Sequence, residues 1–315
     1  MKRVVILGGG TGQSTLLRGL KQFPIDISAV VSVCDDGRST GRLREEFNIF
    51  AVGDIRKVIV SLSETEPLFE ELLNYRFETT SDLNGHTVGN LLLTALSNIS
   101  GNMQEGIEMI GKVLKIKGKV LPFTLDSPTL IGKMEDGSII RGEHYITESP
   151  LKIKDVYYEE DVKVNPSVLK AIDEADLIIL SMGSLYTSII PDLLSKKMIS
   201  VIDKSKAKIL YVCNMMTQPG ETDDFKVSNH VEVLNRYLGK KKISYVIAND
   251  GVIPEDMLYK YANEEQKDEV VLDRENLSDV KLITGNYVTI SDNTIRHKVD
   301  KLSVDIYNIL LEDGE

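Results

Sequence analysis

The sequence predicts an α/β protein, a Rossmann-like three-layer sandwich with a mostly parallel sheet and a small antiparallel insertion. Three observations support this prediction. The chain opens with an apolar run at residues 4–7, followed at once by a glycine-rich segment and a helical pattern. Short apolar runs then alternate with amphipathic helical segments, as in parallel sheets. Polar loops follow the predicted strands, which places them at the carboxyl edge of the sheet, where ligands bind.

The composition is that of an ordinary globular protein. The chain has 315 residues, 42% of them hydrophobic and 27% charged, with a net charge of −11. We expect one domain over residues 1–315, large enough to bury a sizeable core. The negative charge argues against general binding to nucleic acid or anionic membrane. Because the sequence has no signal peptide and no apolar run of membrane-spanning length, we expect a cytoplasmic protein without membrane insertion.

The glycine-rich segment after the first strand is predicted to bind phosphate. Glycines allow a sharp turn and a close approach of an anion. Thr11, Ser14 and Thr15 can cap the following helix, whose free N–H groups point toward the same place. The segment matches neither the dinucleotide fingerprint nor the P-loop, and the alternative is a tight turn without a ligand. The candidate residues are Gly9, Gly10, Thr11, Gly12, Gln13 and Ser14.

The second predicted strand, residues 27–33, ends at two acidic residues. Nucleotide-binding α/β folds hold a ribose hydroxyl at this position, about twenty residues after the glycine loop. We expect Asp35 or Asp36 to contact a ribose, a substrate hydroxyl or Mg²⁺. The alternative is a solvated turn whose arginines pair with acidic residues of the next helix. The side chains expected to face phosphate are Arg38, Ser39, Arg42 and Arg44.

Helical patterns and a β-rich insertion occupy residues 53–158. His86 and Asn90 lie four residues apart at the start of an apolar helix, so both can point into one pocket, although a structural histidine is an equal alternative. Helices are expected at residues 53–62, 67–77 and 104–114, and the stretch 84–93 is expected to turn into an apolar helix through residue 96. The antiparallel insertion, around residues 119–158, is expected to contain strands at 119–125, 129–134, 139–144 and 156–158.

Parallel α/β alternation returns after the insertion. Gly183 and Ser184 follow a buried strand and precede a helix, which makes this loop a second candidate anion site. A diphosphate is then expected between residues 9–14 and 183–188. Asn214 and Thr217 follow the next strand. Further strands are predicted at 208–212, 243–248, 270–272 and 280–283, helices at 167–174, 189–194 and 227–238, and a closing helix opened by Arg296 and His297.

Five segments carry a resemblance to a known family: GGGTGQSTLLRGL, DDGRSTGRLR, GHTVGNLLL, ILSMGSLYTSIIP and NMMTQPGET. They closely resemble the CofD-like family, named after the phospholactate transferase of deazaflavin cofactor synthesis. NMMTQPGET is similar to the bacterial YvcK branch, the gluconeogenesis factors. The resemblance spans essentially the whole chain and implies a Rossmann-like fold. Family members usually read Asp-Asp-Gly-Gly-Ser where this chain has Arg38 after Gly37, which adds a guanidinium beside the pocket.

The two branches imply different functions. The YvcK branch implies binding of a UDP-sugar such as UDP-N-acetylglucosamine, in support of cell shape and wall synthesis on gluconeogenic carbon. Tyr261 and Arg296 would be its contacts. The transferase branch implies Mg²⁺-dependent transfer of a phospholactyl-type group from a guanosine diphosphate donor. We expect the Mg²⁺ near Asp35 or Asp36, with Asp36 as the candidate metal ligand. The candidate catalytic residues are Asp35, Asp36, His86 and Asn90. An oxidoreductase is less favoured, because no hydride-transfer set is present. The sequence leaves the oligomeric state open, a homo-oligomer included.

Overall fold

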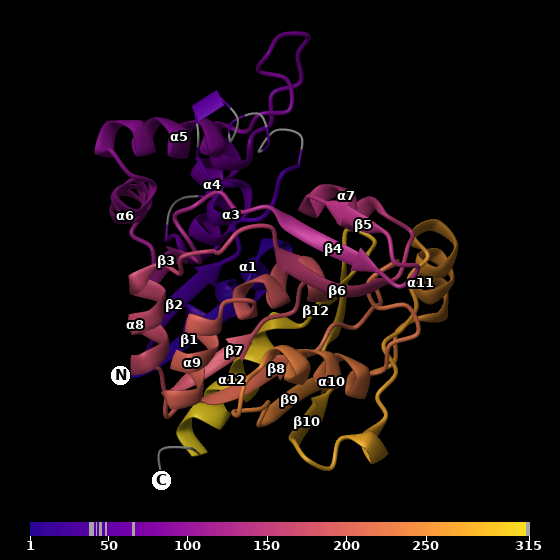
Figure 1. The fold of residues 1–315 in the computed structure, drawn as a ribbon. Coiled ribbons are helices and arrows are strands. Elements are labelled where there is room, and N and C mark those ends of the chain that lie inside the picture. Colours follow the sequence, from indigo (N-terminus) through magenta and orange to yellow (C-terminus); the bar gives the residue numbers. More distant parts are fainter. Residues whose placement is uncertain (38–40, 42, 44–45, 48, 65–66, 313–315) are drawn as a thin grey trace.

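The computed structural model describes residues 1–37, 41, 43, 46–47, 49–64 and 67–312 (Figure 1). Within these residues, the main sheet has seven parallel strands in the order β10-β9-β8-β7-β1-β2-β3. The strand order reverses between β1 and β7, where open parallel sheets bind their ligands. The strands are β1 Lys2–Gly8, β2 Ile25–Val31, β3 Lys119–Pro122, β7 Leu177–Leu180, β8 Lys208–Val212, β9 Tyr245–Asn249 and β10 Lys281–Gly285.

Helices cover both faces of the main sheet, which confirms the predicted three-layer fold. Val4 and Ile6 of β1 face one apolar core, whereas Val5 and Leu7 face the other. Strands buried on both faces explain the continuous apolar runs of the sequence. The first core is covered by α1 Gly10–Leu20, α3 Gly53–Leu62, α6 Met103–Val113 and α12 Val299–Glu312, and the second by α8 Pro166–Glu174, α9 Lys196–Lys204 and α10 Val227–Tyr237.

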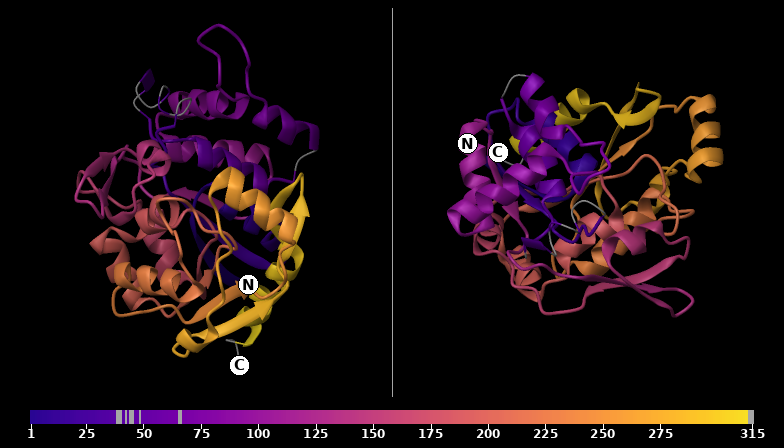
Figure 2. Two further views of the ribbon diagram at one scale, coloured as in Figure 1. Left: turned by 90° about the vertical axis from the view of Figure 1, so that its right-hand side faces the viewer. Right: turned by 90° about the horizontal axis from the view of Figure 1, so that it is seen from above.

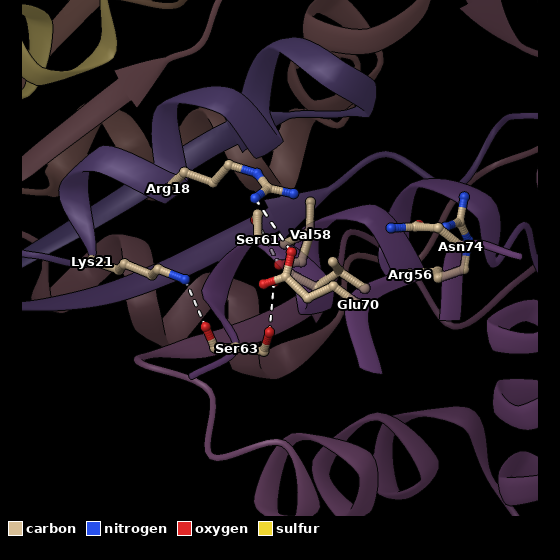
Figure 3. Close-up of polar contacts among 9 residues, drawn as sticks. Arg18, Lys21, Arg56, Val58, Ser61, Ser63, Glu70 and Asn74 are labelled. Atoms are coloured by element: carbon tan, nitrogen blue, oxygen red, sulfur yellow. Dashed lines mark hydrogen bonds and ion pairs between the residues drawn. The ribbon is translucent and has the colours of Figure 1, made fainter. Parts of the chain in front are cut away.

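Two further helices, α4 Pro67–Asn74 and α5 Val88–Ser100, lie beside α6 at the top of Figure 1. Leu73 is the one residue of α4 that is buried. Polar contacts tie α4 to the rest of the fold, as Figure 3 shows: the Arg18 guanidinium of α1 lies 3.4 Å from the Glu70 carboxylate, and Arg56 of α3 donates to the Asn74 side chain. Helix α4 is therefore held mainly by these polar contacts, with Leu73 as its one buried side chain.

The antiparallel insertion starts later than predicted. Residues 119–122 form β3 of the main sheet, parallel to β2. The insertion consists of β4 Leu130–Met134, β5 Ile139–Arg141 and β6 Ile153–Tyr158, in the order β5-β4-β6. The predicted strand at 139–144 ends early because Gly142, with φ of +102°, turns the chain into helix α7 Glu143–Glu148. Figure 2 shows the insertion from two further sides.

The C-terminal part differs most from prediction. Residues 294–297 form strand β12 Thr294–His297, which pairs with β11 Val288–Ser291, and α12 begins only at Val299. Arg296 and His297 therefore belong to a hairpin rather than to a helix start. The predicted strand at 270–272 is irregular chain. Helix α11 Glu255–Lys260 continues into the π-helical turn Tyr261–Glu265. No helix in the described part of the chain is long and apolar enough to cross a bilayer.

Candidate functional site

The glycine loop presents a helix end without a side-chain cap. Gly9 is the extended N-cap residue of α1, and within the described part of the chain this helix start has no side-chain cap. The Ser14 hydroxyl instead donates to the Gly10 carbonyl at 2.9 Å, and Thr15 donates to Thr11 at 2.8 Å. The prediction that Thr11, Ser14 or Thr15 caps the helix is therefore wrong. An uncapped helix end keeps backbone donors and a partial positive charge for an anion.

Two residues of this loop serve the packing of the loop itself. The Gln13 side chain is fully buried and donates to the carbonyls of Ile6 (2.9 Å) and Val30 (2.8 Å), so it braces α1 against β1 and β2 and points away from any ligand. A Cβ on Gly12 would lie 1.5 Å from the Met182 carbonyl oxygen. Glycine at position 12 therefore allows the loop after β1 to contact the loop after β7.

The loop after β7 is already bound by an anion from the chain itself, the side chain of Glu221. Its carboxylate accepts hydrogen bonds from the Ser184 hydroxyl (2.7 and 2.8 Å), the Tyr186 N–H (3.1 Å) and the Gln218 amide (2.6 Å). Burial raises the pKa of Glu221, against the effect of these hydrogen bonds. Because this carboxylate occupies the start of the helical turn Leu185–Ile189, the structure contradicts a second free anion site there.

A pocket of about 340 Å³ opens beside both loops. It gathers residues from the glycine loop, from the segments after β7 and β8, from the turn after α11 and from β12. Seven of the predicted binding residues line it: Gly12, Gly183, Ser184, Asn214, Thr217, Tyr261 and Arg296. The remaining lining residues are Met182, Met215, Met216, Gln218, Glu265, Lys267, Thr294, Ile295 and His297.

Several of the lining side chains hold the shape of the pocket. The Asn214 amide donates to the Gly183 carbonyl at 2.7 Å, which links the loops after β7 and β8. The Thr217 hydroxyl accepts from the Asp268 N–H at 2.8 Å. The Tyr261 hydroxyl accepts from the Ile295 N–H at 3.0 Å, so it ties the π-helical turn to β12.

Two cations face this pocket. Arg296 is exposed, and among the described residues no hydrogen bond or ion pair holds its guanidinium. The Lys267 ammonium lies 2.7 Å from the Glu265 carboxylate and 6.0 Å from the centre of the Tyr261 ring. The site therefore offers a guanidinium for an anion beside an aromatic ring.

His297 does not add a third cation. Its Nε2 lies 3.1 Å from the Cys213 carbonyl oxygen, and burial lowers its pKa to about 4. The ring is therefore neutral at physiological pH and serves as a hydrogen-bonding group.

Carboxyl groups gather on the other side of the glycine loop. A Cβ on Gly9 would lie 2.8 Å from the Asp54 carboxylate, which pairs with Lys57 at 2.9 Å. Burial, followed by the charge of Asp54, raises the pKa of Asp35. Burial, followed by the charge of Asp35, raises the pKa of Glu143 to about 8. Neighbouring carboxylate charge therefore adds to burial in raising the pKa of both Asp35 and Glu143.

The other candidate catalytic residues lie in different surroundings. The Asp36 carboxylate accepts from the His144 N–H at 2.8 Å and so anchors the start of α7. The side-chain Oδ1 of Asn90 accepts from the Arg56 guanidinium at 3.1 Å. His86 is buried and, like Asn90, does not line the pocket described above. Arg38 and Ser39, together with Arg42 and Arg44, lie outside the described residues.

Sequence reasoning missed Lys267 and Gln218 as pocket residues. Lys267 belongs to no motif of the sequence, and Gln218 occurs only within the family segment NMMTQPGET. Among the described residues, no group of three or more His, Cys, Asp or Glu side chains is arranged to hold a metal ion.

Comparison with known proteins gives consistent matches over the full chain. The model of the family "2-phospho-L-lactate transferase CofD" matches residues 4–288. The gluconeogenesis factor of Bacillus subtilis (strain 168) is 43% identical over 313 residues, covering 98% of both chains. The gluconeogenesis factor of Halalkalibacterium halodurans is also 43% identical, over 96% of this chain and 94% of that one. The crystal structure of a UPF0052 family protein from Bacillus halodurans has a TM-score of 0.93 at 42% identity, covering 97% of this chain and 99% of that chain.

Proposed function

This chain belongs to the 2-phospho-L-lactate transferase CofD family and resembles its gluconeogenesis factors, and we propose that it binds a nucleotide-sugar of the UDP-N-acetylglucosamine type. We propose further that it does so in the cytoplasm, in support of cell shape and wall synthesis during growth on gluconeogenic carbon. This role is the one implied by the resemblance to the YvcK branch.

The observation that carries the binding proposal is the Arg296 guanidinium, which has no hydrogen-bond or ion-pair partner among the described residues and lines the pocket with Tyr261. A diphosphate needs positive charge, and the net charge of −11 means that only a local arrangement can supply it. Arg296 supplies this charge directly, and the uncapped start of α1 adjoins the pocket through Gly12, whereas the charge of Lys267 is offset by Glu265 in the same pocket. The polar wall of Asn214 and Gln218 offers donors and acceptors for a base or a sugar.

Isothermal titration calorimetry with UDP-N-acetylglucosamine tests the proposal. We expect one site per chain with micromolar affinity. Arg296→Ala should weaken binding by roughly tenfold or more, because a hydrogen bond to a charged group contributes about 1.5–3 kcal/mol.

Arg141→Ala is the matched control. Arg141 is an exposed arginine outside the pocket, paired with Glu159 at 2.6 Å, and exposed pairs contribute little to stability. Its variant should bind like the unaltered protein. The absence of heat with any UDP-sugar, together with clear binding of GDP or NADP, would contradict the proposed ligand class.

A second candidate function is group transfer from a nucleotide diphosphate donor. Asp35, Asp54 and Glu143 lie around the glycine loop, and the raised pKa of Glu143, about 8, suits a group that gains and releases a proton near neutral pH. In this candidate function, Glu143 would hold the proton and Asp54 would orient the acceptor. Transfer of a phosphoryl-type group depends mainly on such positioning and electrostatics.

The carboxylate oxygens of Asp35 and Asp54 are suitable Mg²⁺ ligands, whereas Asp36 is committed to the start of α7. Mg²⁺ commonly binds through one or two carboxylates together with substrate phosphates, so the small donor set fits a cation that arrives with the nucleotide. When bound, Mg²⁺ would supply charge neutralisation at the diphosphate.

Incubation with a phospholactyl guanosine diphosphate donor, a deazaflavin acceptor and Mg²⁺ tests this candidate. Product formation that is lost in Asp54→Asn and kept in Asp224→Asn, a control at an exposed acid, would support it. Donor binding without any product would contradict group transfer, and nucleotide-sugar binding would then be the remaining proposal.

A further inference from the structure

A polar recess lies at the amino ends of β1, β2 and β3, on a sheet face that is otherwise apolar. Val5 of β1 belongs to the second apolar core, and because the side chains of a strand alternate between faces, Arg3 lies on the same face. The strand register places Asp26 beside Arg3, and it places Ser28 between Val5 and Lys119. Two cations, a carboxyl group and a hydroxyl group therefore share this corner of the sheet.

A pocket of about 590 Å³ opens over this recess, between α6 and α8. One face of each helix forms a wall, with Ile107 and Gly111 from α6 and Ala171 and Glu174 from α8. On the left of Figure 1, β3 lies between these two helices. The pocket that contains Arg296 adjoins the loops that follow β1, β7 and β8, so the two pockets lie at opposite edges of the main sheet.

The pocket between α6 and α8 has an excess of positive charge, opposite to the charge of the whole chain. Its lining includes five cations and three acids, on a chain with a net charge of −11. Glu174 engages two of the cations, since its carboxylate lies 3.5 Å from Arg3 and 4.0 Å from Lys170. Among the described residues, no ion pair or hydrogen bond engages the other three ammonium groups, those of Lys112, Lys115 and Lys119. These three cations are available to an anionic ligand.

A buried serine gives an independent indication of a ligand. Ser28 is 9% exposed and lines the pocket, yet its hydroxyl has no hydrogen-bond partner among the described residues. Buried hydroxyls are normally hydrogen-bonded, so this one indicates a polar group that enters the pocket. The Asp26 carboxylate, on the same face of β2, also lines the pocket and lacks a partner within the described part of the chain. It can accept a hydrogen bond from a ligand hydroxyl.

We propose that this α6–α8 pocket, defined by Asp26, Ser28, Lys112, Lys115 and Lys119, binds a small phosphorylated sugar or polyol. The lysines hold the phosphate, and Ser28 and Asp26 bind the hydroxyl groups. No aromatic residue is found among the described residues that line the pocket, so no ring there stacks on a nucleobase. The volume lies in the range of small-molecule sites. The pocket shares no lining residue with the one that contains Arg296, so binding here does not require a nucleotide-sugar.

Isothermal titration calorimetry with glucose 6-phosphate and, separately, with inorganic phosphate tests the proposal. The unaltered chain should bind glucose 6-phosphate at one site and more tightly than inorganic phosphate, because only the sugar adds contacts to Ser28 and Asp26. Lys115→Ala combined with Lys119→Ala should weaken the binding of both probes by roughly tenfold or more. Lys133→Ala combined with Lys197→Ala, the same change of charge at two exposed lysines outside the pocket, is the matched control and should bind both probes as before.

Ser28→Ala separates the hydroxyl contacts from the phosphate contacts. This variant should bind glucose 6-phosphate roughly fivefold more weakly and inorganic phosphate as before, while far-UV circular dichroism stays unchanged. The absence of heat with glucose 6-phosphate would overturn the proposal, as would equal affinities of the two double-lysine variants. Unchanged binding of both probes by Ser28→Ala would exclude a sugar as the ligand. Binding of glucose 6-phosphate that is lost in Arg296→Ala would also overturn the proposal, since it would assign the sugar phosphate to the other pocket.

Discussion

At the scale of single residues, buried carboxyl groups decide the character of the site. Glu221 is 4% exposed and occupies the start of a helical turn that the sequence predicts to be free for a ligand. Glu143 and Asp35 share their surroundings with Asp54 beside the glycine loop. Because Glu221 already bonds the start of that turn, we expect the phosphates of the proposed nucleotide-sugar beside Arg296 instead.

Removal of the Glu221 carboxylate should destabilise the protein. Glu221→Ala leaves the Tyr186 N–H, the Ser184 hydroxyl and the Gln218 amide without their acceptor in a buried place. We expect a loss of about 2–4 kcal/mol in the free energy of unfolding, measured by urea denaturation. Glu269→Ala, at an exposed glutamate, is the control. Equal stability of the two variants would show that the hydrogen bonds of Glu221 are not needed.

The raised pKa of Glu143 predicts a pH dependence of stability. Its folded-state pKa of about 8 lies above the ordinary value of 4.5. Between these values the folded chain keeps a proton that the unfolded chain has released, so the free energy of unfolding falls as the pH rises from about 5 to about 8. Glu143→Gln cannot titrate and should be more stable than the unaltered chain by about 2–4 kcal/mol at pH 8.5, but not at pH 5. Urea denaturation at both pH values measures this, and parallel pH slopes would contradict it.

At the scale of elements, the contact between the loops after β1 and β7 sets the geometry of the site. These loops belong to adjacent strands at the point where the strand order reverses. The contact between Gly12 and Met182 brings them together, and the Asn214 amide links the loop after β7 to the one after β8. The pocket opens along this line of contacts.

Two glycines on facing loops should respond differently to the same change. Gly12→Ala places a methyl group 1.5 Å from the Met182 carbonyl oxygen, which forces the backbone to move and should cost more than about 3 kcal/mol of stability. In Gly183→Ala the nearest atom is 3.7 Å away, and we expect a change below about 1 kcal/mol. Thermal unfolding monitored by circular dichroism compares the two. Gly12→Val is consequently a poor test of ligand binding, because it should disturb the fold itself.

At the scale of the whole molecule, the pocket joins segments that are far apart in the sequence. Gly12 and Arg296 lie near opposite ends of the chain and line the same space. A ligand in that space binds only to the folded chain and should therefore stabilise the molecule as a whole.

Addition of UDP-N-acetylglucosamine should raise the unfolding temperature. At a concentration one hundred times the dissociation constant, linkage predicts about 2.7 kcal/mol of added stability, or several degrees in a protein of this size. Differential scanning calorimetry measures the shift. The shift should shrink strongly in Arg296→Ala and persist in Arg141→Ala, and an equal shift in both variants would place the ligand elsewhere.

The sequence by itself determined the layers of the fold and most of the polar segments at the site. Buried strand segments such as 4–7 and 209–212 are apolar on all sides, and this local pattern does not depend on distant contacts. The prediction that Tyr261 and Arg296 share one site came from the resemblance, and the structure brings them to the same pocket. The closing hairpin was missed because two short strands, only four residues each, have too few residues for a clear period.

Only the tertiary structure decided which of the polar residues are free to act. Gln13, Asp36 and Asn90 carry suitable chemistry, yet their side chains are engaged by the chain's own backbone or by Arg56. Glu221 lies 37 residues after Ser184, and no local pattern indicates that it satisfies the helical turn there. Hydrogen-bond partners and burial are set by contacts between distant segments, and these same contacts determine the pKa of each buried group.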